Sequence, residues 1–599
     1  MHFRHWTHVI FVRSVMFLPN GAPAEPPGLK LDPIEIEIIR ARLRAISEEM
    51  GVTLSRTSMS PVIYEIRDFS CGICAADGQL ISQANGITAY TGIFSNVVRS
   101  VRKKHGPTIM AGDIFITNDP YAGSTHTADV MVIKPIFFEG QLVSFVVAAA
   151  HWTELGGSVA GSLSPQASEI FHEGLRLTNL RIFRAGIRQE DVFDMIAANV
   201  RMPAMSLGDL NAQIAGVRIG GLRMREICEL YGAETLKQAF QKILTAGEAA
   251  SRRAIAALPE GTYTAHDWID GDGATDEPIP VAISITIKHD RLIFDFTGSG
   301  PQRNAPLNCT VGALEAAVKT VFKAIVDPGG ALDDGWFRPI KVQVPEGTIF
   351  SAQPPAPTGW YFEVTAHASD LVWKAFASII PARVSAGSYL SLCVTYLGGT
   401  DRTGSAPYVL VEPHLGGWGA TAQADGENAL IALTDGETYN YPVELFEAKF
   451  PFRINKYGLN VIGSSGQGKF RGGLGIVREY EALSEDAFVF ASFGRSVHKP
   501  WGVNGGSEGS VNAIEVIRNG KSQTISRLPF VRLRRGEKFR VLTGGGGGFG
   551  APQDRPPASV SHDLTEGYID EETAAEFYAA GPSSHTTAKP KSTRKSKRK

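Results

Sequence analysis

Residues 118–157 read NDPYAGSTHTADVMVIKPIFFEGQLVSFVVAAAHWTELGG, and the rest of the chain is organised around this stretch. It contains two apolar runs rich in β-branched residues, 130–138 and 142–150, separated by Glu139-Gly140. Two such runs joined by a short glycine-containing turn predict a β-hairpin. We therefore expect a rigid antiparallel ribbon, with the polar residues of the stretch at its open end.

The open end of the predicted hairpin carries His126, Asp129 and His151. With the turn centred on its two residues, antiparallel pairing places Ala128 opposite His151 and Asp129 opposite Ala150. Two imidazoles and a carboxylate on a rigid ribbon suit a divalent metal, because the strands fix the ligands while open positions remain for water or substrate. The competing interpretation is an ordinary polar hairpin end, since His-x-x-Asp spacing alone is common.

Length and composition indicate a large globular protein. The chain has 599 residues, 43% of them apolar and 20% charged, with a net charge of −2. This length exceeds one ordinary core, so we expect three or four lobes or one large multilayer body. The helix and strand patterns along the chain predict an α+β body, multi-lobed and with much antiparallel sheet. The near-zero charge gives no reason to expect a polyanionic partner, and no apolar run is long enough to cross a membrane.

Cysteine usage favours a reducing compartment, and we expect a cytoplasmic protein. Five cysteines are an odd number, spread thinly over a long chain. Cys71 and Cys74 have the spacing of a redox or zinc pair, but no second pair exists and the segment resembles a strand. Buried thiols in a strand are the favoured interpretation.

The two ends of the chain are expected to lie outside the folded body. Residues 1–30 are interpreted as disordered, or as an extension from a misplaced start with Met16 as the true first residue. A weak signal peptide is the other interpretation, because residues 9–17 form a short apolar patch. Residues 557–599 form a C-terminal segment that ends in AKPKSTRKSKRK, a composition typical of a solvated, disordered tail. Nucleic-acid binding by this tail is the lesser alternative, because nothing else in the chain supplies a basic or aromatic surface for it.

Between these ends the pattern divides the chain into three regions. Residues 31–191 form the α+β region that holds the candidate metal site, beginning with a capped helix that is expected to stop at Gly51. Residues 192–258 show long helical runs and predict a helical insertion. Residues 259–556 alternate strand patterns, glycine-rich segments and isolated helices, which predicts a mixed antiparallel β/α region.

Two glycine-rich segments are candidate phosphate sites, and neither is convincing. Residues 463–470 read GSSGQGKF and differ from a P-loop, because Phe470 replaces the Ser or Thr that would hold magnesium. Residues 543–550 read TGGGGGFG, for which close backbone packing is favoured over anion binding. We therefore expect no ATP site on this chain, and no G-x-S-x-G nucleophile elbow is present either.

Several segments, taken together and in order, resemble the hydantoinase B/oxoprolinase family. They are LDPIEIEIIRARL, RDFSCGICAADGQLISQ, GDIFITNDPYAGSTHTADV, NAPLNCTVGALEAAV, LDDGWFRPIKVQVPEGT, HLGGWGATAQADGENA, YPVELFEAKFPFRI, GKFRGGLGIVREYE and LTGGGGGFGAPQDR. The resemblance runs from about residue 31 to about residue 556 and implies a large subunit of ATP-dependent hydantoinases, oxoprolinases and related ketone carboxylases.

The resemblance also implies a ligand set and a partner. Carried onto matching positions, the family's metal ligands are Asp68, His126, Asp129 and His151. Two histidines and two carboxylates favour manganese or zinc, with iron as the weaker option. ATP and magnesium are then expected on a partner, an actin-like ATPase subunit of the hydantoinase A type, so that the enzyme is a hetero-oligomer.

Two further residues are candidate catalytic groups. Asp119 leads into the histidine motif and is expected to orient the ligands or cap a turn, and Glu154 is a candidate proton carrier. The chain departs from the family at residues 358–369, TGWYFEVTAHAS, which is expected to change the substrate pocket. The leading expectation is hydrolysis of a cyclic amide or imide such as hydantoin or 5-oxoproline; the alternatives are carboxylation of a ketone and a non-catalytic scaffold.

Overall fold

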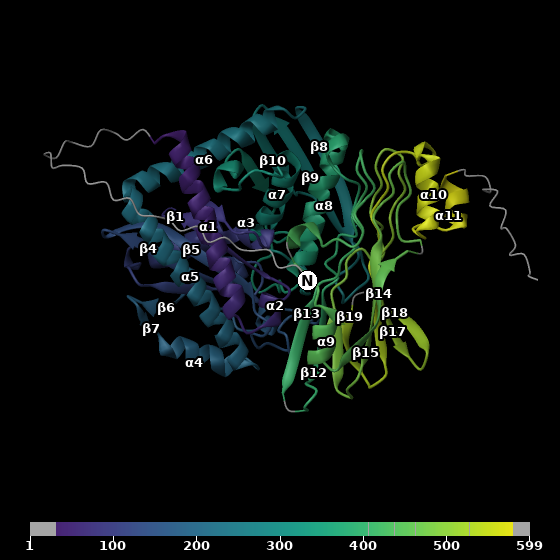
Figure 1. Cartoon of the computed structure of the whole chain (residues 1–599), viewed down its shortest axis with the longest axis horizontal. Helices are drawn as coiled ribbons and strands as arrows, with labels where there is room; N and C mark the ends of the chain where they lie inside the picture. Colours follow the sequence, from purple (N-terminus) through teal and green to yellow (C-terminus); the bar gives the residue numbers. More distant parts are fainter. Residues whose placement is uncertain (1–30, 405, 437, 462, 526–527, 579–599) are drawn as a thin grey trace, which may run out of the picture.

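The computed structural model describes residues 31–404, 406–436, 438–461, 463–525 and 528–578 (Figure 1). The expectations for residues 1–30 and for the basic tail from residue 579 onward lie outside the described residues. The first helix, α1 (Pro33–Thr57), begins with the predicted capping box, in which Asp32 and Glu35 cap each other's backbone. Its predicted end at Gly51 is wrong, because the apolar stripe continues to Leu54 and the glycine lets the ring of Phe69 approach closely.

The predicted hairpin lies at the centre of a seven-stranded antiparallel sheet with the order β2-β1-β5-β4-β3-β6-β7. The strands are β1 (Phe69–Ala75), β2 (Leu80–Gln83), β3 (Ile114–Thr117), β4 (Asp129–Phe138), β5 (Gln141–His151), β6 (Leu180–Arg184) and β7 (Ile187–Arg188). Both faces of this sheet are covered by helices, which explains why β4 and β5 are apolar along nearly their whole length.

The helices around this sheet come from the N-terminal half of the chain (Figure 1). They are α2 (Pro61–Tyr64), α3 (Thr88–His105), α4 (Glu190–Asn199), α5 (Pro203–Tyr231) and α6 (Ala233–Ala256). Helices α1, α5 and α6 share one apolar core with the sheet, and α3 forms a second core on the opposite face. The helical pattern of residues 192–258 therefore supplies one layer of the sheet's cover.

The register of the hairpin differs by one residue from the prediction. The turn at Glu139-Gly140 is as expected, but the pairing shifts between Ile136 and Phe137, so that Val143 has no partner opposite it. Such a bulge displaces every later pair by one residue. As a result Asp129 pairs directly with His151, and the predicted pairing of His151 with Ala128 is wrong.

From residue 261 onward the described part of the chain contains three further sheets, which confirms the expected α+β class. The first has the order β11-β10-β9-β8 and consists of β8 (Gly261–Ile269), β9 (Ile279–Lys288), β10 (Arg291–Asp295) and β11 (Ile340–Gln343). The second sheet has the order β13-β12-β16-β19 and consists of β12 (Thr395–Thr400), β13 (Pro407–Glu412), β16 (Ala487–Ala491) and β19 (Leu528–Leu533). The third has the order β14-β15-β20-β17-β18 and consists of β14 (Phe452–Asn460), β15 (Gly475–Ala482), β17 (Ala513–Arg518), β18 (Lys521–Ile525) and β20 (Lys538–Leu542).

Two helices connect the halves of the molecule. Helix α7 (Val311–Val326) packs against both α3 and α8 (Tyr361–Ile379), and α8 in turn packs on β8 and β9. Helix α8 is buried along most of its first four turns. The remaining helices are α9 (Val443–Lys449), α10 (Pro557–Thr565) and α11 (Glu571–Phe577), the last two at the far right of Figure 1.

The glycine run at residues 543–550 packs backbone against backbone, as the sequence favoured. A Cβ on Gly545 would lie 1.6 Å from the carbonyl oxygen of Ser464, and one on Gly546 would lie 2.1 Å from that of Trp418. The P-loop-like segment takes part in the same packing, since Phe470 forms a bridge with Phe549. The cysteines in the described part of the chain are free and buried, and no helix there is both long and apolar enough to span a membrane.

Candidate metal centre

The bulged hairpin gathers three of the predicted ligands at its open end. Asp129 is the first residue of β4, His151 is the last residue of β5, and the two pair directly across the ribbon. Asp129 Oδ1 lies 2.9 Å from His126 Nε2 and 3.3 Å from His151 Nδ1. One ligand atom from each of the three side chains lies within 4.8 Å of the other two, and all three side chains are buried.

Asp68 approaches the same point from the neighbouring strand. It immediately precedes β1, which pairs with β5, and its carbonyl oxygen accepts a hydrogen bond from the backbone N–H of His151 at 3.1 Å. Its side chain is farther away, with Oδ2 3.9 Å from His151 Nδ1. The structure therefore brings together all four residues that the resemblance implies, with Asp68 at the edge of the cluster.

Tyr90 on α3 joins the two carboxylates, and the sequence reasoning missed it. Its hydroxyl lies 2.6 Å from Asp68 Oδ1 and 2.6 Å from Asp129 Oδ1. A tyrosyl hydroxyl has one proton to donate, so the second contact needs a proton from a carboxyl group. Burial raises the pKa of Asp68, which makes that residue the one able to carry the proton.

The orientation of His126 is fixed from the opposite half of the molecule. Its Nδ1 lies 2.7 Å from the carbonyl oxygen of Gly359, and because a carbonyl oxygen only accepts, Nδ1 carries the proton. Nε2 is then directed toward Asp129. Gly359 is itself held by Glu173, whose carboxylate accepts its N–H at 2.6 Å and that of Thr358 at 3.0 Å.

The charges at the centre depend on one another. Burial alone would raise the pKa of Asp129, but the neighbouring imidazoles of His126 and His151 hold it well below its usual range. Burial opposes protonation of His151, yet the carboxylates of Asp129 and Asp68 raise its pKa. The hydroxyl of Thr125 also donates to Asp129 Oδ2, so both oxygens of this carboxylate have partners.

These residues form one end of a cavity. The other walls are apolar or aromatic, apart from the additional carboxyl group of Asp435. The lining residues are Val62, Ile66, Asp68, Ile87, Tyr90, His126, Asp129, His151, Tyr361, Phe362, Leu392, Val394, Tyr396, Val411, Pro413 and Asp435. Of the divergent segment 358–369, Tyr361 and Phe362 line the cavity, whereas the indole N–H of Trp360 donates to Leu163.

The two predicted catalytic groups do not line this cavity. Asp119 caps the following turn through the N–H of Tyr121 and accepts a hydrogen bond from Thr178 at 2.6 Å. Glu154 is fully buried, and its carboxylate accepts the N–H groups of Gly156 and Gly161 and pairs with Arg201 at 3.0 Å. Both carboxylates thus hold loops near the hairpin. Asp119 caps a turn, which is one of the two roles expected of it, and the position of Glu154 outside the cavity does not favour a proton carrier.

The chemistry of the cluster fits a divalent metal. With the His126 proton on Nδ1, Nε2 and Asp129 Oδ1 face each other at 2.9 Å, so this contact needs a positive charge between the two atoms, either a second proton on the imidazole or a bound metal. His151 Nε2 is buried and has no hydrogen-bond partner among the described residues. Two imidazole nitrogens with one or two carboxylates are a ligand set typical of zinc, manganese or iron.

Sequence comparison agrees with this geometry. The profile of the family described as hydantoinase B/oxoprolinase matches residues 32–552. The chain belongs to this family. A relative from Pseudomonas sp. (strain NS671), named as one subunit of a putative D-/L-hydantoinase, is 31% identical over 568 residues, covering 92% of this chain and 95% of that protein.

Two solved structures of this family's fold resemble the chain. The crystal structure of the ATP-dependent caprolactamase from Pseudomonas jessenii superposes with a TM-score of 0.86 at 26% identity, covering 92% of this chain and 96% of that one. The nucleotide-free structure of an acetone carboxylase superposes with a TM-score of 0.85 at 20% identity, covering 91% and 79%. The second likeness shows the shared fold alone.

Proposed function

We propose that this family member is the metal-bearing subunit of an ATP-dependent amidohydrolase that opens cyclic amides or imides. The observation that carries the proposal is the buried cluster of His126, Asp129 and His151 at one end of this cavity. A metal held by these residues and Asp68 would polarise the substrate carbonyl or lower the pKa of a bound water so that it can attack.

The side chains around the cluster are assigned three tasks. The Tyr90 hydroxyl holds a proton within reach of the reacting atoms and orients both carboxylates, since the tyrosyl oxygen lies 2.6 Å from each of them. The Gly359 carbonyl keeps His126 in the tautomer that turns Nε2 inward. The apolar side chains of the cavity wall exclude bulk water, which protects an activated intermediate from unproductive hydrolysis.

The charge of the cavity favours neutral rings over 5-oxoproline. Its lining includes the carboxyl groups of Asp68, Asp129 and Asp435, and none of its described residues is an Arg or Lys. A substrate carboxylate would find no arginine or lysine to pair with among these residues. A hydantoin or a simple lactam, with a neutral planar amide, avoids this cost, and the rings of Tyr361 and Phe362 offer it flat contacts.

Activation by ATP is assigned to a partner subunit of the hydantoinase A type, an actin-like ATPase that carries ATP and magnesium. The support is that both glycine-rich candidates for a phosphate site on this chain are occupied by backbone packing, as at Gly545 and Gly548. The free, buried cysteines agree with a cytoplasmic hetero-oligomer.

The test combines the purified chain with its ATPase partner, ATP and a panel of hydantoin, 2-pyrrolidone, caprolactam and 5-oxoproline. We expect ring opening coupled to ADP release, fastest with a neutral ring, and metal in the purified protein by elemental analysis. His126→Ala and His151→Ala should each lose metal and turnover. His105→Ala is the matched control, because this histidine contacts the Asn179 carbonyl away from the cavity.

Three outcomes would count against the proposal. Absence of substrate-dependent ADP release with every member of the panel would exclude this substrate class. Incorporation of labelled bicarbonate into a ketone would replace hydrolysis by carboxylation. Unchanged turnover in both histidine variants would leave the cluster with a structural role.

A further inference from the structure

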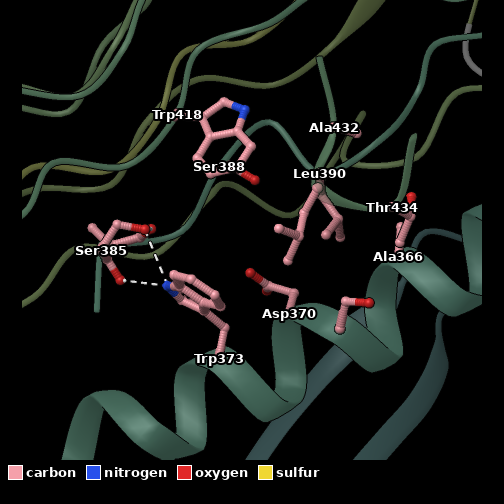
Figure 2. Close-up of a pocket in the computed structure, with 12 residues that line it drawn as sticks. Ala366, Asp370, Trp373, Ser385, Ser388, Leu390, Trp418, Ala432 and Thr434 are labelled. Atoms are coloured by element: carbon pink, nitrogen blue, oxygen red, sulfur yellow. Dashed lines mark hydrogen bonds between the residues drawn. The ribbon is translucent and has the colours of Figure 1, made fainter. Parts of the chain in front are cut away.

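A second cavity lies on the side of α8 shown in Figure 2. Its floor is α8, and the loops at residues 385–390 and 432–434 and Trp418 close the other sides. The lining residues are Ala366, Ser369, Asp370, Trp373, Ser385, Ala386, Ser388, Leu390, Trp418, Ala432, Leu433 and Thr434. None of them lines the metal cavity.

The two cavities lie on either side of one short segment. Leu433 and Thr434 line the second cavity, whereas the next residue, Asp435, lines the metal cavity. In the same way, Leu390 lines the second cavity and Leu392 lines the metal cavity. The second cavity is therefore a neighbour of the metal centre and separate from it.

Two buried hydroxyl groups in the second cavity lack partners. Ser369 is 4% exposed and Thr434 is 6% exposed, and neither hydroxyl makes a hydrogen bond within the described part of the chain. Native proteins rarely leave such groups unsatisfied, because burial without a partner costs about 1–3 kcal/mol. A ligand carbonyl that accepts from these hydroxyls would remove that cost.

Asp370 supplies an acceptor in the same cavity. Arg495 Nη2 at 2.6 Å and Trp501 Nε1 at 3.0 Å both donate to its Oδ2, and its carboxylate points into the space that Figure 2 shows. The carboxylate is already paired with the buried guanidinium of Arg495, which also contacts Asp267. The carboxylate therefore suits a neutral N–H donor better than a full cation.

Two indole rings border the cavity and are held in place by hydrogen bonds. Trp373 Nε1 donates to the carbonyl and hydroxyl oxygens of Ser385, at 3.1 and 3.0 Å (Figure 2). Trp418 Nε1 donates to the carbonyl oxygen of Ile431 at 2.9 Å. Fixed aromatic rings at the borders of a cavity favour a flat ligand, which makes broad contacts with them.

We propose that this cavity is a binding site for a small, neutral, planar ligand with adjacent N–H and C=O groups, namely a cyclic amide or ureide. The N–H group would donate to Asp370, and the carbonyl oxygen would accept from Ser369 and Thr434. This inference rests on the proposed function in one respect: the ligand belongs to the class proposed as substrate, so the protein would hold a second copy beside the metal centre.

The test measures binding of hydantoin and 2-pyrrolidone to the full chain by titration calorimetry, and locates them by soaking crystals. Ser369→Ala and Thr434→Val should each weaken binding between about twofold and tenfold, the range expected for one hydrogen bond. Neither should lower the melting temperature, because each removes an unsatisfied hydroxyl. Ser378→Ala is the control on the same helix, since that hydroxyl is bonded to Ala375 and lies outside the cavity.

The measurements separate this inference from the proposed function. The His126→Ala variant should still bind the ring in the second cavity, although its metal centre is broken. Binding there without turnover of any ring would support the site and refute only the function. Turnover with no ring density between Trp373 and Asp370, or guanidinium bound in preference to the amides, would overturn the inference.

Discussion

Replacement of Tyr90 by phenylalanine tests whether the metal centre is built as its geometry indicates. The hydroxyl contacts Asp68 Oδ1 and Asp129 Oδ1, both at 2.6 Å, and is the described hydrogen-bonding link between those two carboxylates. A hydrogen bond to a charged group contributes about 1.5–3 kcal/mol. Loss of a group that orients metal ligands lowers metal affinity about 10- to 100-fold. In binding free energy this is about 1.4–2.8 kcal/mol, close to the contribution of one such hydrogen bond.

We therefore expect Tyr90→Phe to fold, to bind its metal about 10- to 100-fold more weakly and to lose turnover at limiting metal. Affinity is measured by competition with a chelator, and stability by urea unfolding of the metal-free proteins. Tyr389→Phe is the matched control, because it removes another buried tyrosyl hydroxyl, which donates to the His414 carbonyl at 3.1 Å outside the metal cavity. A Tyr90→Phe affinity within twofold of the wild-type and control values would refute the assigned role.

Three further predictions concern residues that do not line the metal cavity. Burial raises the pKa of Glu173 to about 8 in the folded protein. The stability that its protonated form contributes is therefore complete below the ordinary pKa of a glutamate and is lost as the pH rises through 8. Glu173→Gln should reduce the fall in unfolding free energy between pH 5 and 8, and an unchanged slope would contradict this. Glu154→Gln should lower the melting temperature but keep turnover per folded molecule, whereas a hundredfold slower reaction at normal stability would restore its role as a proton carrier. Gly545→Ala should destabilise the protein by about 3 kcal/mol or more in urea unfolding, while Gly458→Ala, where a Cβ meets nothing within 4 Å, should be tolerated.

The hairpin was predictable because its signal is local. Apolar runs on either side of Glu139-Gly140 predict both strands and the turn, and the structure has them at those positions. The register was not predictable, because no glycine or other characteristic residue marks the bulge at Val143 in the sequence. That single unpaired residue decides that Asp129 faces His151.

The rest of the centre depends on long-range packing. Tyr90 reaches the carboxylates from α3 and Gly359 reaches His126 from the loop before α8, and neither position carries a motif that would distinguish it in sequence. Asp435 lines the cavity from a third segment. Asp68 was assigned through the family resemblance, and the pairing of β1 with β5 is the physical reason that it lies near the histidines.

This dependence on distant segments explains why the centre favours a cation. Asp68, Asp129 and Asp435 bring three carboxyl groups into one cavity, and burial together with mutual repulsion raises the pKa of Asp68 and of Asp435. Folding can offset that repulsion in two ways, by protonating some of the groups or by binding a positive charge between them. The imidazoles supply part of this positive charge, since the carboxylates of Asp129 and Asp68 raise the pKa of His151 and favour its protonated form. The proposed divalent metal would supply the rest of the positive charge. Because its ligands would come from the hairpin and from the residue before β1, the same ion would hold these segments together in one rigid site.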